Sequence, residues 1–346
     1  MSPSVPHPDP PSPADQANSA RRWSGPAPAK VNLFLRVLAR EESGYHQVET
    51  LFQALELADD VTLEFQPEPG AIRLHVVGVP PDALGPPETN LVVRAARLLL
   101  DAVGTETPGL RIHLVKRIPH GAGLGGGSSD AATVLRGLNE LLGRPLEPPR
   151  LATLGGQLGA DVPFFLCGSP LALAWGRGDR VLPLPPLPAA DVLVALPEAR
   201  ISTPDAYARL AQWRAERQLT AAPARLLGEG FPDSAGATPS GGGLLPWSSW
   251  GAVARAAGND FALALHDGYP ELAAIRDTLE RSGARPALLS GSGSAVFGVF
   301  PEGASGSGME IETDGISVLR TRTLAGGSDG GTAPGPRSIR VERARG

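Results

Sequence analysis

The alternation of apolar and polar residues along the chain predicts several β-strands. In the segment KVNLFLRV, residues 30–37, neighbouring side chains fall on opposite faces of a strand. One face would carry Val31, Leu33, Leu35 and Val37, and the other Lys30, Asn32 and Arg36. Lys30 and Asn32 then point the same way, about 7 Å apart. Further strands are predicted over residues 61–65, 72–77, 111–115 and 191–196, and a strand–loop–strand unit over residues 288–300.

Apolar residues at helical spacing predict helices between these strands. The first runs from an N-cap at Asn90 to Gly104, which suits the left-handed position after a helix. A second follows Gly127 and ends before Gly143, with an apolar stripe on one side. Others are predicted over residues 150–158, in a short segment opened by Asp161, from about Thr203, and over residues 269–282.

Changes in composition along the chain suggest how it is divided into domains. Stretches rich in proline, serine and glycine cannot bury enough apolar surface to offset the entropy of ordering, so they favour arms, linkers and surface loops. The predicted divisions are a disordered arm (residues 1–23), an N-terminal domain (24–182), a proline-rich boundary (183–188), a C-terminal domain (189–325) with a surface insertion (219–250), and a disordered tail (326–346).

Composition and charge narrow the class of protein. A chain of 346 residues, 42% hydrophobic and 19% charged, is long enough for two or three globular domains. A net charge of −5 argues against a nucleic-acid partner bound by a broad basic face, although it allows a local cationic pocket. Cys167 is the single cysteine, which excludes an intramolecular disulfide and fits a reducing compartment. With no run of 18 apolar residues and no apolar stretch near the N-terminus, we expect a cytoplasmic protein without a membrane partner. The sequence gives no prediction of oligomeric state.

A glycine-rich loop between a predicted strand and a predicted helix is the strongest local signal for chemistry. Residues without large side chains let backbone N–H groups approach an anion, and the following helix adds its positive N-terminal end. The loop therefore predicts a cradle for nucleotide phosphates. The alternative is a flexible loop with Ser128 as an ordinary N-cap, which the direct passage from strand to amphipathic helix disfavours. The candidate phosphate-binding residues are Pro119, His120, Gly121, Ala122, Gly123, Leu124, Gly125, Gly126, Gly127, Ser128 and Ser129.

Other nucleotide-binding loops fit this segment less well. Residues 121–126 satisfy the G-x-G-x-x-G fingerprint, so an NAD-linked oxidoreductase is a competitor. That fold expects a second strand with an acidic end about 20 residues later, where this chain has the proline-rich LGRPLEPPRL. A Walker A loop needs a lysine before Ser128, and the H-R-D and D-F-G motifs of protein kinases do not occur.

The loop PHGAGLGGGSS, residues 119–129, resembles the phosphate-binding loop of the GHMP kinases. The resemblance extends from about residue 26 to 300 and implies an α+β fold with two domains, one like ribosomal protein S5 domain 2 and one ferredoxin-like. His120 departs from the family, which often has methionine there, and so do the arm, the insertion and the tail. Three further segments narrow the resemblance to the branch that phosphorylates a cytidyl diphosphate, namely residues 28–35, 44–46 with 50–53, and 159–165. Later segments agree with it, namely residues 203–204, 259–260 and 290–294.

The resemblance implies a catalytic pair. It places a general base at Asp161, which would take a proton from an alcohol, whereas spacing alone favours a helix cap. It brings Lys30 beside Asp161 to keep the carboxylate ionised and to stabilise the phosphoryl group, whereas an isolated strand lysine is usually solvated. Asn32 would bind the diphosphate or polyol end of the substrate.

The resemblance also implies binding roles. Tyr45 and Tyr207 would stack on a cytosine ring, His46 would bind its edge, and Thr203 would make polar contacts. Two positions match residues near adenine, although each has a plain alternative as a helix N-cap or a solvated lysine: Asn90 and Lys116. Residues 290–294 resemble a second glycine loop facing the phosphates, with a hairpin turn as the alternative. Mg²⁺ would accompany ATP, with no ligand assigned and Ser128 and Asp130 as candidates by proximity.

The reaction implied is ATP-dependent phosphorylation of the 2-hydroxyl of 4-(cytidine 5′-diphospho)-2-C-methyl-D-erythritol, in the non-mevalonate route to isoprenoid precursors. One alternative is a GHMP kinase that acts on mevalonate or homoserine, which would have no use for residues 45–46. Another is a nucleotide sensor without catalytic activity.

Overall fold

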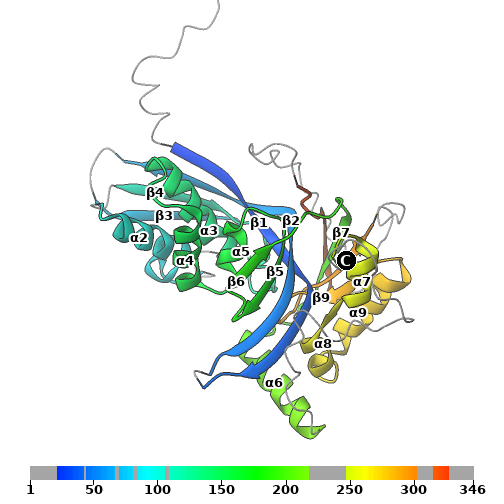
Figure 1. Ribbon diagram of the computed structural model, residues 1–346. Helices are drawn as coiled ribbons and strands as arrows, with labels where there is room; N and C mark the ends of the chain where they lie inside the picture. The colour runs from blue at the N-terminus through cyan, green and yellow to red at the C-terminus, as the bar shows by residue number, and fades with distance from the viewer. Residues whose placement is uncertain are drawn as a thin grey trace, which may run out of the picture.

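The structure is a computed structural model that describes residues 22–42, 44–66, 70–80, 84–105, 109–217, 247–301 and 315–326. These residues form two β-sheets, each with helices packed against it, and the two long strands β1 and β2 run between the two parts of the molecule (Figure 1). Among them, no helix is long and apolar enough to cross a membrane.

The N-terminal sheet is built mainly from long antiparallel strands. Its order is β3-β4-β2-β1-β8, and β5 and β6 extend it beside β2. The strand predicted at 72–77 is confirmed, and the strand predicted at 111–115 begins one residue earlier. The strand predicted at 61–65 is the end of the longer β2, and the sequence pattern did not predict β5 and β6. The strands are β1 (Arg22–Arg40), β2 (His46–Phe65), β3 (Ile72–Val77), β4 (Leu110–Val115), β5 (Leu171–Gly176), β6 (Arg180–Pro183) and β8 (Gly258–Asn259).

Helices cover one face of this sheet and enclose the N-terminal core. The predicted caps of α2 are confirmed, because Asn90 accepts the Val92 N–H and Gly104 adopts φ 66°. The apolar faces of α2 and α3 pack on strand residues such as Ile112 and Leu114. The helical segments are η1 (Pro87–Thr89), α2 (Leu91–Val103), α3 (Gly126–Leu141), α4 (Pro148–Leu158) and α5 (Val162–Leu166).

The C-terminal sheet has the order β11-β7-β10-β9, with every pair antiparallel. Counted along the chain, this is the 4-1-3-2 order of a ferredoxin-like sheet, as expected. The elements are β7 (Asp191–Leu196), α6 (Thr203–Glu216), α7 (Trp250–Ala256), α8 (Asp260–Leu265), α9 (Pro270–Arg281), β9 (Ala287–Leu289), β10 (Val296–Phe300) and β11 (Ser317–Arg322).

Two predicted boundaries need correction. Arg22 and Trp23, assigned to the arm, belong to β1, and the indole N–H of Trp23 donates to Glu140 at 2.9 Å. The insertion was predicted to reach residue 250, but Trp250 is buried, begins α7 and donates to the Pro188 carbonyl at 2.9 Å. In both cases a tryptophan anchors the chain to the fold. The rest of the arm (1–21), residues 218–246 and the tail from 327 lie outside the described residues.

The predicted faces of β1 are wrong from Leu35 onward, because a β-bulge after Asn32 interrupts the alternation. Asn32 pairs with Phe52, but the register shifts before Phe34, so that Leu35 pairs with Thr50. Residues opposite each other in an antiparallel pair share a face, so Leu35 lies on the face of Asn32 rather than opposite to it. Val31 and Leu33 accordingly join a different core cluster from Leu35 and Val37.

Candidate active site

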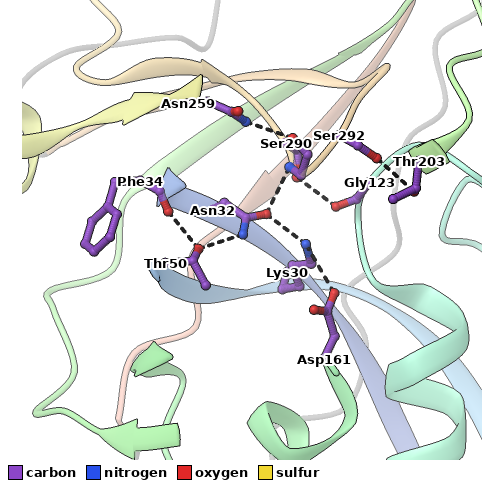
Figure 2. Close-up of polar contacts among 11 residues, drawn as sticks. Lys30, Asn32, Phe34, Thr50, Gly123, Asp161, Thr203, Asn259, Ser290 and Ser292 are labelled. Atoms are coloured by element: carbon purple, nitrogen blue, oxygen red, sulfur yellow. Dashed lines mark hydrogen bonds and ion pairs between the residues drawn. The ribbon is translucent and has the colours of Figure 1, made fainter. Parts of the chain in front are cut away.

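The residues around Lys30 and Asn32 form a buried polar row on β1 and β2 (Figure 2). The Lys30 Nζ donates to Asn32 Oδ1 at 2.8 Å, so the two side chains share a face as predicted. The Asn32 amide donates to the Thr50 hydroxyl at 2.8 Å, and that hydroxyl donates to the Phe34 carbonyl at 2.7 Å. The bulge that follows Asn32 makes this arrangement possible, because it brings Thr50 and the Phe34 carbonyl together.

Asp161 approaches this row from the start of α5. Its Oδ2 lies 3.4 Å from the Lys30 Nζ, and the carboxylate is 31% exposed while the lysine side chain is 4% exposed. The interpretation of Lys30 as a solvated strand lysine is therefore wrong. The interpretation of Asp161 as a helix cap is also wrong, because its side chain accepts no hydrogen bond from the α5 backbone. The carboxylate is open to solvent on one side and able to take a proton from a hydroxyl.

The glycine loop lies directly over Lys30. The Leu124 carbonyl accepts the Lys30 backbone N–H at 2.9 Å, and a Cβ on Gly125 would meet the Lys30 side chain at 2.8 Å. Three of its glycines, at 121, 123 and 125, have φ between 72° and 80°, which other residues rarely adopt. The loop thus presents its backbone beside the Lys30–Asp161 pair, as a phosphate cradle requires.

The helix that follows the loop begins two residues earlier than expected. Gly125 is its N-cap and α3 starts at Gly126, so Ser128 is the third helical residue and not the cap. The N–H groups of the first turn remain available to an anion, since no side chain caps them. Two loop side chains, Ala122 and Leu124, are buried in the core and anchor the loop, whereas His120 is exposed.

A second glycine loop, residues 290–294, meets the first from the C-terminal domain (Figure 2). The Ser290 hydroxyl donates to the Gly123 carbonyl at 3.0 Å, and the Gly291 N–H donates to Asn32 Oδ1 at 2.9 Å. Asn259 holds this loop from the other side through bonds of 2.8 Å to the Leu289 and Gly291 carbonyls. The hairpin is therefore part of the site and joins both domains there.

Lys116 lies beneath the start of α3 and is buried, so its interpretation as a solvated lysine is wrong. Its Nζ bonds to Asp130 at 2.7 Å and to Asp59, whose other oxygen accepts the Ile118 N–H at 2.8 Å. Burial raises the pKa of Asp130 to about 7; Lys116 opposes this shift and the Asp59 carboxylate adds to it. Burial alone would lower the pKa of Lys116, but the two carboxylates raise it. This buried ionic cluster fixes the beginning of the glycine loop and α3 to β2.

The residues predicted to bind cytosine lie at the other end of the site. His46 and Tyr207 stack on each other, with ring centroids 4.5 Å apart and planes 20° apart. Burial raises the pKa of Tyr207, and the negative charge of Asp161 raises it further, which places Tyr207 within electrostatic reach of Asp161. Tyr45 is 60% exposed and lies against the Arg177 guanidinium at 4.4 Å rather than against Tyr207.

The remaining predicted residues are placed as follows. The Thr203 hydroxyl, at the start of α6, lies 3.0 Å from the Ser292 hydroxyl of the second glycine loop. The Asn90 side chain caps α2, so its contact with adenine stays a prediction. As a metal ligand Asp130 does not fit, because its carboxylate is buried and bonded to Lys116, while Ser128 is partly exposed. The described residues hold no group of three or more acidic, histidine or cysteine side chains suited to a metal ion.

Sequence reasoning missed three residues that build the site. Thr50 belongs to a motif for which the sequence predicts no separate role, although its position opposite a polar strand face is a usable signal. The sequence likewise predicts no role for Asn259. Asp59 gave no usable signal, because its partner Lys116 is 57 residues away and only the folded sheet brings them together.

Comparisons with known proteins agree with this geometry. The family profiles described as "GHMP kinases N terminal domain" and "GHMP kinases C terminal" match residues 90–169 and 245–307. The 4-diphosphocytidyl-2-C-methyl-D-erythritol kinase of Solibacter usitatus is 42% identical over 79% of this chain and 79% of its own length. A crystal structure of 4-(cytidine 5′-diphospho)-2C-methyl-D-erythritol kinase aligns with TM-score 0.59 and 40% identity over 80% of this chain and 90% of that one. The homoserine kinase of Cytophaga hutchinsonii, at 22% identity and TM-score 0.54 over 81% of this chain and 85% of its own, shares the fold alone.

Proposed function

Because this chain belongs to the 4-diphosphocytidyl-2-C-methyl-D-erythritol kinases, within the GHMP kinase family, we propose that it phosphorylates 4-(cytidine 5′-diphospho)-2-C-methyl-D-erythritol. The γ-phosphoryl group of ATP is transferred to the 2-hydroxyl, which gives the 2-phosphate and ADP. In this reaction the O–P bond to the acceptor forms, the bond between the γ-phosphorus and the ADP oxygen breaks, and the hydroxyl proton leaves. The product would feed the non-mevalonate route to isoprenoid precursors.

The observation that carries the proposal is the Lys30–Asp161 pair beside the glycine loop. Asp161 is the residue that takes the hydroxyl proton, because its carboxylate is partly exposed and is not used as a helix cap. Lys30 is held by Asn32 and Asp161, so its positive charge is fixed where charge develops on the transferred group. A fixed charge needs no reorganisation during the reaction, which is why its burial supports a catalytic role.

The glycine loop and the first turn of α3 are suited to the triphosphate. Backbone N–H groups at an uncapped helix N-terminus bind anions, and the glycines leave room for a phosphate to approach. Mg²⁺ bound with ATP would offset the charge of the β- and γ-phosphates. Ser128 is the residue of this chain that fits beside it, and we assign no other ligand.

The cytidyl end of the substrate would bind at His46, Tyr207 and Tyr45. Stacking on an aromatic ring is worth about 1–3 kcal/mol per base, and the edge of a cytosine offers both donors and acceptors. The His46–Tyr207 pair and the exposed Tyr45 provide rings, and His46 a polar edge, for this group. A kinase for mevalonate or homoserine would have no base to stack here.

The test is ADP release by the purified protein with the cytidyl diphosphate substrate, with mevalonate and with homoserine. We expect turnover with the cytidyl substrate and competition by free CDP. D161N should lower kcat by about 10²–10⁴-fold, as expected for loss of a general base, and leave the affinity for ATP unchanged. Turnover with mevalonate or homoserine that free CDP does not inhibit would indicate a sibling kinase instead. ATP binding without turnover of any of the three substrates, unchanged in D161N, would favour a nucleotide sensor.

A further inference from the structure

The dipeptide Asn259-Asp260 joins β8 to α8 and lies next to β1. Asn259 is the last residue of β8, which pairs in parallel with Phe34 and Leu35, and its side chain caps α8 by accepting the Phe261 N–H at 3.0 Å. Asp260 is the first residue of α8. The two side chains bond to different parts of the site.

Asn259 bonds to the part of the site that carries Lys30 and the second glycine loop. Its amide nitrogen donates to two carbonyls, those of Leu289 and Gly291, each at 2.8 Å. The N–H of Gly291 in turn donates to Asn32 Oδ1, the oxygen that also accepts the Lys30 amine. A Cβ built on Gly291 would lie 3.5 Å from the Lys30 Nζ, so this backbone passes close to the lysine. Asn259 therefore fixes the position of the second glycine loop relative to Lys30.

Asp260 bonds to the part of the site that carries Tyr207. Its Oδ2 accepts the Val37 N–H and the Arg214 guanidinium, both at 2.9 Å, and the same Arg214 nitrogen donates to the Val37 carbonyl at 2.7 Å. These bonds join β1, α8 and α6 at one point. We call these bonds among Asp260, Arg214 and Val37 the clamp. Arg214 lies two turns after Tyr207 on α6, so the clamp sets the position of that helix, and of the tyrosine, relative to β1.

The packing of α6 increases its dependence on this clamp. The helix buries only Ala206 and Leu210 fully, which is a narrow apolar contact for 14 residues. The ring of Phe261, the residue after Asp260, meets Tyr207 edge-on with centroids 4.9 Å apart. Tyr207 is thus held by α8 at its ring and through the Arg214–Asp260 pair along its helix.

We propose that Asn259 and Asp260 are positioning residues, each for one half of the reaction: Asn259 aligns the second glycine loop with Lys30 and Asn32, and Asp260, through Arg214, aligns α6 and Tyr207 for the cytidyl group. This inference rests on the proposed function. It predicts that substitutions at these two adjacent residues affect different quantities, kcat for one and the affinity for CDP for the other, which a common loss of stability would not produce.

The test compares N259D with D260N. N259D keeps the oxygen that caps α8 but removes both donors to the loop, so kcat should fall by about 10- to 100-fold, as small misplacements of reacting groups do, while CDP binds within about twofold of wild type. D260N keeps an acceptor for the Val37 N–H but loses the charge that pairs with Arg214. The dissociation constant for CDP, measured by calorimetry, should rise about tenfold, with kcat at saturating substrate little changed.

Controls separate these effects from a loss of folding. Q212A removes a side chain on the exposed face of α6 that, within the described part of the chain, bonds only to Glu216 in the same helix, and should change neither quantity. R214A should weaken the binding of CDP as D260N does. The double variant should raise the dissociation constant for CDP by less than the product of the two single increases. N259S, whose hydroxyl can cap α8 but is too short for both carbonyls, replaces N259D if that variant does not fold.

The outcomes distinguish the two proposals. If the wild-type protein neither binds CDP nor turns over the cytidyl substrate, the proposed function fails. If it does both, and folded D260N and N259D change kcat and CDP affinity in parallel or not at all, the positioning roles are refuted.

Discussion

Gly123→Ala tests the contact between the two glycine loops. Gly123 has φ 80°, and a Cβ there would lie 2.1 Å from the Ser290 carbonyl oxygen and 3.1 Å from that of Gly293. Contacts this short do not occur for real Cβ atoms, and both neighbours are backbone, so no side chain can move aside. The two loops must separate by more than about 1 Å, on top of about 1 kcal/mol for a left-handed alanine.

The separation should reach the reacting groups. The Ser290–Gly293 turn also carries Gly291, whose N–H binds Asn32 beside Lys30. A displacement of about 1 Å at a catalytic group can cost about 10²-fold in rate. We therefore expect G123A to lower kcat by about 10²-fold, with a loss of unfolding free energy of about 2–3 kcal/mol from strain and lost contact.

Gly143→Ala is the matched control. Gly143 has φ 82°, but its Cβ would meet nothing within 4 Å, and it lies at the far end of α3 from the loop. G143A should cost about 1 kcal/mol in urea denaturation and leave kcat unchanged. The reasoning is refuted if folded G123A keeps wild-type kcat, or if G143A loses as much activity as G123A.

Three further predictions concern single side chains. Tyr45→Ala should raise KM for the cytidyl substrate about tenfold or more by removing a stacking ring, with KM for ATP unchanged in the same ADP-release assay. Burial raises the pKa of Asp130 to about 7, so the folded state holds a proton that the unfolded state loses from about pH 4 upward. The unfolding free energy of the wild type, measured with urea, should therefore fall relative to that of D130N between pH of about 5 and about 8. A difference between the two proteins that stays constant with pH would contradict this. Burial, and then the charges of Arg40 and Arg214, lower the pKa of His46, so R214A should raise that pKa in an NMR titration; an unchanged value would place Arg214 too far away.

Local signals in the sequence predicted the elements that carry the glycine loop. The caps of α2 at Asn90 and Gly104 are set by side-chain and backbone geometry within a few residues. The glycines that adopt positive φ lie close together in the sequence, so the tight loop they form over the strand is also a local signal. The pairing of Lys30 with Asn32 follows from the period of a strand, since both lie before the bulge.

What could not be predicted depends on distant parts of the chain. The bulge after Asn32 has no local mark, and a shift of one residue exchanges the faces of everything beyond it. The burial of Lys116 requires Asp59 and Asp130, from β2 and α3, to meet beneath the loop. The short α7 and β8 are stabilised by contacts with β1 and with the domain boundary rather than by their own sequence pattern.

These long-range contacts determine how precisely the proposed catalytic groups can be held. Lys30 and Asn32 lie on β1 where it pairs with β2, so the sheet fixes their position. Asp161 comes from α5 in the same domain, but the oxygen of Asn32 that orients Lys30 is shared with Gly291 from the other domain. A small rotation between the domains would break the Gly291 bond before it disturbed the Lys30–Asp161 pair. The alignment of the lysine therefore depends on the polar contacts that keep the two glycine loops together, and substitutions at that contact should reduce activity at denaturant concentrations where the sheets are still folded.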